Sequence, residues 1–448
     1  MSKKNMQVHE NLTKKYGEFF CASPWNSLHE GPEGLTSTCC KTRVPIGYST
    51  KNSYEEMYNS EHAKSVRKDF LEGKKPQQCS ACWDLETDGK PSLNRVHGNT
   101  MSTEKVIDDL VAATDKDGTL HKHKPEWLDM LWTSKCNFAC LGCSPDLSST
   151  INNKYKKEFA ILHGGNMRKY FPDMTNWDNG SQHKIDYILK HSDTIRSIHL
   201  NGGEPFMNQD TYELLEELLK RGLHKKIQIW SHTNGSITKS YKGADIVEDY
   251  LVHWGQNAKV TMSNDGFGAM GEYIRWGYKD KKWLSTYEKV RDSGVVLTIQ
   301  TCWNIFNSLY IEEMGEWFLD NCKWAPFNPP FDKPDGSLTI WMDYSVCPDM
   351  LNYIPELKQQ GINSLKNTLK NRNHPLSWTE NLNRWIDWLA GPSRKNLQAK
   401  AYSLEGKVDN LKDWFNGCTA LDQKRGTNLC RDIPRLAPLY ELGNEVVN

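Results

Sequence analysis

Short apolar runs alternate with amphipathic stretches between residues 127 and 330. The runs WLDMLW, SIHL, IQIW, KVTM and VVLTIQ have the length of buried strands and are bounded by polar turns. The stretches YELLEELLKR, ADIVEDYLVHW and YIEEMGEWFLDN lie among them and have the apolar spacing of helices. Strands that alternate with helices form βα units and a mainly parallel sheet. We therefore predict an α/β fold, with a sheet that is either open or barrel-like.

The pattern changes on both sides of this core. Residues 1–100 contain five of the thirteen cysteines and turn-rich pieces such as HEGPEGLTSTCC, which predicts a small domain stabilised by a metal. Residues 101–124 end in the polar stretch DKDGTLHKHKPE and are predicted to be a linker, in which a solvated turn is favoured over metal binding by the two histidines. Residues 125–330 form the predicted core domain, and residues 331–448 a mainly helical extension.

Composition and charge exclude several classes of protein. Lys plus Arg and Asp plus Glu both number 56, so no net field attracts nucleic acid or anionic lipid. The N-terminal stretch lacks the apolar core of a signal peptide, and no run of about 18 apolar residues predicts a membrane span. We expect a cytoplasmic protein without membrane or nucleic-acid partners. Clustered cysteines in a reducing compartment indicate metal binding in place of disulfides.

Three cysteines, Cys136, Cys140 and Cys143, follow the first predicted strand in the stretch SKCNFACLGC. The carboxyl ends of parallel strands are where βα folds place their active sites. Three thiolates leave one iron of a four-iron cluster open for a further ligand. From the spacing alone, a zinc site that lacks its fourth ligand, or three separate buried thiols, are alternatives.

The next strand ends in NGGEP, with Gly202, Gly203 and Glu204. Adjacent glycines let a ligand approach the backbone, and a carboxylate can accept hydrogen bonds from an ammonium group. A C-x3-C-x2-C loop followed after one βα unit by this turn resembles the radical S-adenosylmethionine (radical SAM) superfamily. The resemblance implies that the three cysteines hold a [4Fe–4S] cluster. It also implies that SAM chelates the fourth iron and that the GGE stretch binds the SAM amino group.

Further stretches match this family in the expected order. SHTNGS ends the third strand and VTMSNDGFG the fourth. By resemblance, Ser263 and Asp265 contact the methionyl and ribose portions of SAM, and Arg275 its carboxylate; a helix cap or a surface ion pair is the alternative role of each. Gly142 stands where the family usually has a bulky residue that holds the adenine, so backbone groups or another ring such as Phe138 must take that part.

GFGAMG also satisfies the dinucleotide-binding pattern G-x-G-x-x-G. It follows the fourth strand instead of opening the first βα unit, so NAD or FAD binding is disfavoured.

A second set of cysteines lies in residues 1–100. Its four thiols suffice for a closed zinc site or a fully ligated iron–sulfur cluster. Next to a radical SAM core, the spacing C-x12-G-x4-C followed by C-x2-C resembles the Twitch or SPASM auxiliary-cluster domain, here in front of the core. The resemblance implies an auxiliary [4Fe–4S] cluster, and Cys39 is preferred over the adjacent Cys40 because it keeps the glycine spacing. The predicted ligands are Cys21, Cys39, Cys79 and Cys82.

The resemblance implies a partial (β/α)6 TIM-like barrel that reductively cleaves SAM to a 5′-deoxyadenosyl radical, which abstracts hydrogen from a substrate. Relatives with such auxiliary domains favour a ribosomally made peptide as substrate, and a sugar, amino acid or nucleotide is the alternative. A flavodoxin- or ferredoxin-type reductant is the implied partner. Cys302, just past the fifth strand, is a candidate hydrogen-atom donor. A zinc-stabilised binding protein without activity is the alternative from another class.

Overall fold

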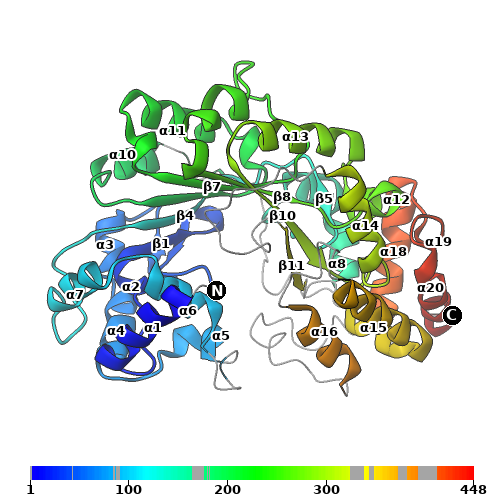
Figure 1. The fold of residues 1–448 in the computed structure, drawn as a ribbon, viewed down its shortest axis with the longest axis horizontal. Coiled ribbons are helices and arrows are strands. Elements are labelled where there is room, and N and C mark those ends of the chain that lie inside the picture. The colour runs from blue at the N-terminus through cyan, green and yellow to red at the C-terminus, as the bar shows by residue number, and fades with distance from the viewer. Residues whose placement is uncertain are drawn as a thin grey trace. The chain divides into compact units, whose positions relative to one another are not determined.

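The computed structural model describes residues 3–42, 44–83, 86, 91–163, 176–178, 180, 182–322, 338–342, 348–371, 381–391 and 411–447. The chain divides into two compact units. Unit 1 consists of Met1–Thr133, Trp177–Pro205 and Asp210–Ser231, and unit 2 of Ser134–Asn176, Phe206–Gln209 and His232–Asn448. Each contains parallel strands connected through helices (Figure 1). The predicted α/β class is thereby confirmed, and the parallel strands and helices expected of a partial (β/α)6 barrel occur in both units.

Unit 1 contains a mixed sheet. Its strands, in spatial order, are β7 (Gln228–Thr233), β6 (Ser197–Asn201), β4 (Trp127–Leu131), β1 (Ser27–Glu30), β2 (Leu35–Ser37) and β3 (Gly47–Tyr48). The pairs from β7 to β1 are parallel, and those from β1 to β3 are antiparallel. Paired positions on β1, β4, β6 and β7 carry apolar side chains that are at most 1% exposed, and these form the core on one face of the sheet: Leu28, Leu128, Ile198 and Ile229.

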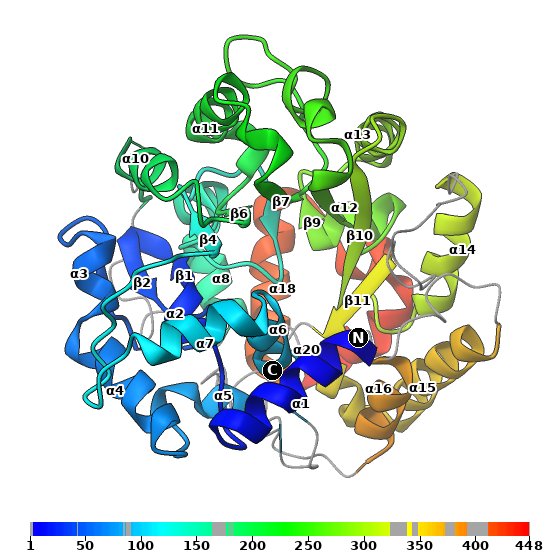
Figure 2. The same cartoon turned by 60° about the vertical axis from the view of Figure 1, so that its left-hand side comes forward.

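The helices of unit 1 are α1 (Lys3–Tyr16), α2 (Ser23–Asn26), α3 (Tyr54–Tyr58), α4 (Glu61–Leu71), α5 (Ser80–Trp83), α6 (Leu93–Thr100), α7 (Glu104–Ala112), α10 (Gln182–Lys190) and α11 (Gln209–Lys220, whose first residue belongs to unit 2). Polar caps fix several of their starts; the Ser60 side chain, for example, accepts from the backbone N–H of Ala63 at the start of α4. Helices α10 and α11 lie on one side of strands β6 and β7 (Figure 2).

Two features of unit 1 differ from the sequence prediction. The segment 101–124, predicted as a linker, contains helix α7, whose Ile107 and Leu110 are buried. Thr103 caps this helix, and an amphipathic helix of this kind packs its apolar side into a core. The N-terminal region also contributes β1 to the same sheet as β4, so residues 1–133 belong to one unit.

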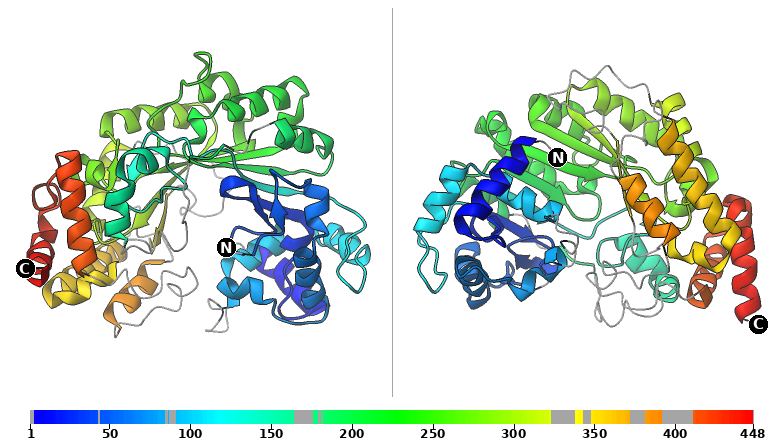
Figure 3. Two further views of the ribbon diagram at one scale, coloured as in Figure 1. Left: turned by 180° about the vertical axis from the view of Figure 1, so that it is seen from behind. Right: turned by 60° about the horizontal axis from the view of Figure 1, so that its bottom comes forward.

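Unit 2 contains the parallel strands β8 (Ala258–Ser263), β10 (Val296–Trp303) and β11 (Leu338–Met342) and the short antiparallel pair β5 (Ala139–Cys140) and β9 (Arg275–Trp276). Its helices are α8 (Lys156–Leu162), α12 (Gly268–Ile274), α13 (Asp280–Asp292), α14 (Ile311–Asn321), α15 (Pro355–Lys370), α16 (Asn381–Ala390), α18 (Leu411–Arg425), α19 (Leu429–Asp432) and α20 (Ala437–Val447). Helices α18 and α20 lie side by side near the C-terminus (Figure 3).

One predicted helix of unit 2 takes another form. ADIVEDYLVHW folds as a π turn over Ile246–Tyr250 and a 3-10 turn over Leu251–His253. Asp245 accepts hydrogen bonds from the backbone N–H groups of Val247 and Glu248 and so starts the π turn. Tyr250, with φ −128° and ψ −67°, interrupts regular helix geometry before the 3-10 turn. No helix of the described residues is long and apolar enough to cross a membrane.

We predict that unit 1 loses stability in acid through His123. Burial lowers the pKa of this imidazole to about 3, and its Nε2 lies 2.5 Å from the Tyr187 hydroxyl. Because the unfolded chain binds a proton near pH 6.5 and the folded chain does not, the free energy of unfolding falls as the pH drops below 6.5. Between pH 7 and 5 the expected loss is about 2 kcal/mol. Urea unfolding of His123→Gln over this range should show a fall smaller by that amount than in the wild type, and equal falls would contradict the assignment.

Candidate functional site

The loop that follows β4 brings Cys136, Cys140 and Cys143 together in unit 2. Cys140 ends strand β5, and the backbone N–H of Cys143 donates to the Cys140 carbonyl at 3.0 Å in a tight turn. Residues of the following segment tie down the start of the loop: Ser149 Oγ accepts from the N–H of Cys136 at 3.1 Å, and Thr150 Oγ1 donates to its carbonyl at 2.7 Å. The loop is therefore fixed by backbone contacts that leave its thiols available as ligands.

Strand β9 places Arg275 directly opposite Cys140. The Arg275 Nη1 donates to Asp265 Oδ2 at 2.7 Å, and the other carboxylate oxygen of Asp265 accepts from the N–H of Cys302 at 2.7 Å. Asn307 adds a hydrogen bond to the Asp265 carbonyl at 3.0 Å. Four of the predicted site residues of unit 2, namely Cys140, Asp265, Arg275 and Cys302, thus form one connected network.

The pKa shifts in this network indicate that a cation, such as the iron of a cluster, binds at the three thiols. Burial raises the pKa of Cys143 well above that of a free thiol, and the neighbouring Cys140 and Cys136 raise it further. Burial by itself would lower the pKa of Arg275, but the Cys140 thiolate and Asp265 outweigh it and raise that pKa. Thiols so close together lose their protons together only when a cation compensates them, as iron does. The buried Nε of Arg275 has no hydrogen-bond partner among the described residues, which leaves a donor for a further ligand. The donor set therefore fits an iron–sulfur cluster with an additional anionic ligand.

The other predicted residues of unit 2 surround this loop. Ser263 ends β8, and its carbonyl accepts from the Trp283 indole at 3.0 Å. Asn234, in the TNG turn, donates from Nδ2 to Asn137 Oδ1 at 2.9 Å and lies 3.9 Å from the Cys136 sulfur. Gly142 is exposed, whereas Phe138 is buried and packs against Gly277. Phe138 thus belongs to the packing of the loop.

Gly202, Gly203 and Glu204 belong to unit 1, at the end of β6. Gly202 has φ +123°, and a Cβ there would lie 2.8 Å from the Thr133 carbonyl, so only glycine fits. The Gly203 N–H donates to the same carbonyl at 2.8 Å. Glu204 is 2% exposed. The backbone itself thus requires glycine at position 202, and the predicted roles of Gly202, Gly203 and Glu204 towards SAM stay predictions.

The four N-terminal cysteines of the prediction line one small cavity of unit 1, with a volume of about 30 Å³. They are Cys21, Cys39, Cys79 and Cys82. Burial raises the pKa of Cys79 well above its usual range, and Cys21 and Cys82 raise it further, so these thiols act on one another. The Cys39 sulfur accepts from the N–H of Lys41 at 3.4 Å. Four thiols around a common space fit a fully ligated iron–sulfur cluster.

Cys40, the alternative to Cys39, is not among the residues that line this cavity. It is exposed, and a hydrogen bond with Cys39 lowers its pKa to about 6. Arg95 also lines the cavity, and its guanidinium forms a two-pronged ion pair with Glu86 at 2.8 and 3.0 Å. This arrangement favours Cys39 as the inward-facing thiol.

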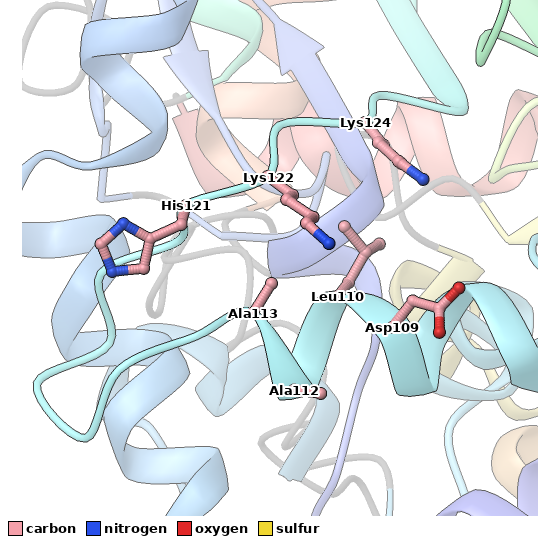
Figure 4. Close-up of a pocket in the computed structure, with 7 residues that line it drawn as sticks. All are labelled: Asp109, Leu110, Ala112, Ala113, His121, Lys122 and Lys124. Carbon is pink, nitrogen blue, oxygen red and sulfur yellow. The ribbon is translucent and has the colours of Figure 1, made fainter.

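A second pocket of unit 1 lies away from these cysteines, between α7 and residues 121–124 (Figure 4). It has a volume of about 420 Å³ and is lined by Asp109, Leu110, Ala112, Ala113, His121, Lys122 and Lys124. His121 Nε2 pairs with Asp115 at 2.6 Å on the surface. In the described part of the chain, no group of three or more His, Cys, Asp or Glu residues is arranged to hold a single metal ion.

Arg425 of helix α18 is a site residue that sequence analysis missed. Its Nη2 donates to the Ala139 carbonyl, inside the cysteine loop, at 2.9 Å, and its Nη1 to the Tyr273 carbonyl at 3.4 Å. The guanidinium also lies over aromatic rings, 4.9 Å from the ring centre of Tyr155 and 5.4 Å from that of Trp276. Helix α18 therefore supports the cysteine loop through a residue that lies 286 positions from Ala139 in the sequence.

We expect Arg425→Met to destabilise unit 2 by about 1–3 kcal/mol, because the buried Ala139 carbonyl loses its charged donor. Reconstituted iron should fall as well, since the loop loses its support. The control is Arg431→Ala, because Arg431 is 65% exposed and pairs only with its neighbour Asp432 among the described residues; exposed pairs contribute about 0–1 kcal/mol. Urea unfolding and iron analysis of both variants test this. Equal stability and iron in the two variants would exclude a supporting role.

Two family models match the sequence. A model described as a 4Fe-4S single cluster domain matches residues 128–253, and the SPASM iron-sulfur cluster-binding domain matches residues 21–83. Among solved structures, anSMEcpe with bound AdoMet is 14% identical with a TM-score of 0.37, covering 59% of this chain and 63% of that chain. Streptococcus suis SuiB bound to precursor peptide SuiA is 13% identical with a TM-score of 0.39, covering 71% and 65%. The chain thus spans slightly less than two thirds of either protein. Comparison with curated proteins gives no match.

The two family matches fall on the two cysteine sets. The first includes the C-x3-C-x2-C loop and the Gly202–Glu204 turn, and the second includes all four cysteines of the N-terminal cavity. Motif, spacing and family match agree for both sets of residues. The matches therefore assign an iron–sulfur cluster-binding domain to each cysteine set, of the SPASM type at residues 21–83.

Proposed function

We propose that the protein is a radical SAM enzyme that abstracts a hydrogen atom from a peptide substrate. The observation that carries the proposal is the network around the cysteine loop, in which three thiols lie beside Arg275 and Asp265. Such a loop supplies ligands for three irons and leaves the fourth for SAM. When bound, the cluster supplies an electron for cleavage of the sulfonium C–S bond of SAM, which gives methionine and a 5′-deoxyadenosyl radical.

The residues of the chain hold and orient the SAM molecule. Arg275, with its buried Nε donor, binds the SAM carboxylate. Asp265 is held between Arg275 and the Cys302 backbone, so its carboxylate fixes the direction of the guanidinium. Ser263 contacts the methionyl portion, and the exposed backbone at Gly142 contacts the adenine. The surrounding protein excludes water from the radical.

Cys302 is the proposed hydrogen-atom donor to a substrate radical. It lies near the end of β10, is partly exposed, and is close enough to act on the charge of Arg275. The four N-terminal cysteines hold an auxiliary [4Fe–4S] cluster that transfers electrons between the substrate and a flavodoxin- or ferredoxin-type reductant.

The first test is the iron and sulfide content of anaerobically reconstituted protein, followed by a dithionite assay with SAM for 5′-deoxyadenosine. About eight irons per chain with SAM cleavage support two clusters and the radical reaction. About four irons with cleavage would make the N-terminal cysteines a zinc site. A colourless protein that holds only zinc would contradict the proposed reaction and support a zinc-stabilised binding protein without activity.

The substrate class is tested by adding extract fractions to the same assay. A low-mass peptide fraction from the organism that encodes the protein should raise the rate of 5′-deoxyadenosine formation. Stimulation by a peptide-depleted metabolite fraction alone would transfer the proposal to a small metabolite.

A further inference from the structure

A row of polar side chains crosses one face of the unit 1 sheet. His29 on β1, Asp129 on β4, His199 on β6 and Trp230 on β7 occupy paired positions of four adjacent strands. Successive residues of a strand point to opposite faces, so this row lies on the face opposite the apolar row of Leu28 and its partners. Parallel sheets are usually apolar on both faces. The polar row therefore needs an explanation that packing does not provide.

Asp129 connects the two histidines of the row. Its Oδ2 lies 2.9 Å from His29 Nδ1, and its Oδ1 lies 3.2 Å from His199 Nδ1. Asn201 Nδ2 donates to the same Oδ1 at 2.6 Å. Burial would raise the pKa of Asp129, but the hydrogen bonds with His199 and His29 hold it below its usual range. One carboxylate thus orients both rings through Nδ1, as carboxylates orient catalytic and ligand-binding histidines.

Aromatic rings flank this triad. Trp230 stacks on the His199 ring with centres 4.3 Å apart and planes at 14°, and Trp127 meets Trp230 edge-on at 6.1 Å. The side chains of the triad are 19%, 12% and 11% exposed, whereas the apolar row on the other face is at most 1% exposed. The polar face is therefore largely buried but less completely covered than the apolar face, with His29 its most exposed member, and fixed polar groups among aromatic ones are typical of a ligand-binding surface.

The row also lies close to the N-terminal cysteine cavity within the same unit. His29 pairs with Ser37 of β2, whose Oγ donates to the Cys39 carbonyl at 2.9 Å, and Cys39 lines the cavity. A group bound at the triad is therefore near the proposed auxiliary cluster.

We propose that the His29–Asp129–His199 triad, with Trp127 and Trp230, is the substrate-binding surface of the enzyme. It takes a substrate segment that presents an amide, hydroxyl or thiol to the oriented imidazoles and a flat or apolar portion to the indole rings. A peptide segment has both features. The assignment rests on the proposed function, since it concerns the substrate of that reaction.

The test measures 5′-deoxyadenosine formation against the concentration of the low-mass peptide fraction. Asp129→Asn and His199→Gln remove a charge-assisted or oriented hydrogen bond, so the half-saturating concentration should rise about tenfold or more. His62→Gln, an exposed histidine of the same unit, should retain the wild-type value.

A second measurement uses the wild-type holoenzyme and does not depend on how the variants fold. Carbethoxylation of His29 by diethyl pyrocarbonate, located by mass spectrometry, should be reduced by the peptide fraction, whereas that of the exposed His62 should be unchanged. The peptide fraction could stimulate turnover without protecting His29, and with the same half-saturating concentration in the variants as in the wild type. That result would overturn the site assignment and leave the proposed function standing. If only the metabolite fraction stimulates turnover, the same measurements are made with that fraction. If neither fraction stimulates turnover, the proposed function fails and this inference fails with it.

Discussion

Replacing Cys136, Cys140 and Cys143 together by Ala is expected to remove about half of the iron and to abolish cleavage of SAM. These thiols supply three ligands to one cluster, and the one other thiol in the described network, that of Cys302, cannot replace three ligands. The iron that remains, about four atoms per chain, belongs to the N-terminal set in the other unit. Iron and sulfide analysis and the electron paramagnetic resonance spectrum of the dithionite-reduced protein measure the change.

The control for this variant is Cys430→Ala. Cys430 is a half-buried residue of helix α19, and we assign it no ligand role. It should retain both the iron content and the rate of SAM cleavage. Unchanged iron in the triple variant would show that the loop does not hold a cluster. Loss of all iron would show that the two sets of cysteines do not load independently.

The elements with a strong local signal were predictable from the sequence. Stretches such as WLDMLW and VVLTIQ are mostly apolar, and the structure forms β4 and β10 from them. Strand β1 was not predicted because SLHE contains a single apolar residue, and pairing with β4 decides its conformation. The π turn at Ile246–Tyr250 was predicted as a helix because the apolar spacing of the two is nearly the same.

The candidate site residues likewise include some that were predictable from the sequence and some that were not. Both cysteine sets were visible because their ligands are clustered, with spacing that chemistry requires. The triad of His29, Asp129 and His199 was not visible, because its members are about a hundred and about seventy residues apart and none belongs to a motif. Arg425 was missed for the same reason, since only tertiary structure brings it to Ala139. Local spacing thus predicts ligands of a cluster, whereas residues that orient or support them depend on strand register and packing.

The two adjacent cysteines of the N-terminal set allow a matched pair of substitutions. Cys39→Ala should lose the auxiliary cluster, and with it about four of about eight irons, because Cys39 lines the cavity with Cys21, Cys79 and Cys82. Cys40→Ala should keep the cluster, because Cys40 is exposed and is not among the residues that line the cavity. Both variants remove one thiol from the same turn, so a general effect on folding would change them alike.

The iron content distinguishes the Cys39→Ala variant from the Cys40→Ala variant. The rate of SAM cleavage in the absence of substrate is a second measurement on both. The Cys39 variant should still cleave SAM, since the C-x3-C-x2-C loop belongs to the other unit and keeps its own ligands. If Cys40→Ala loses iron and Cys39→Ala does not, Cys40 is the ligand. The turn must then direct the Cys40 thiol, and not that of Cys39, into the cavity. Full iron in both variants would mean that this cavity holds no cluster. Zinc retained by the wild type and lost from Cys39→Ala would instead identify a closed tetrahedral zinc site built from the same four thiols.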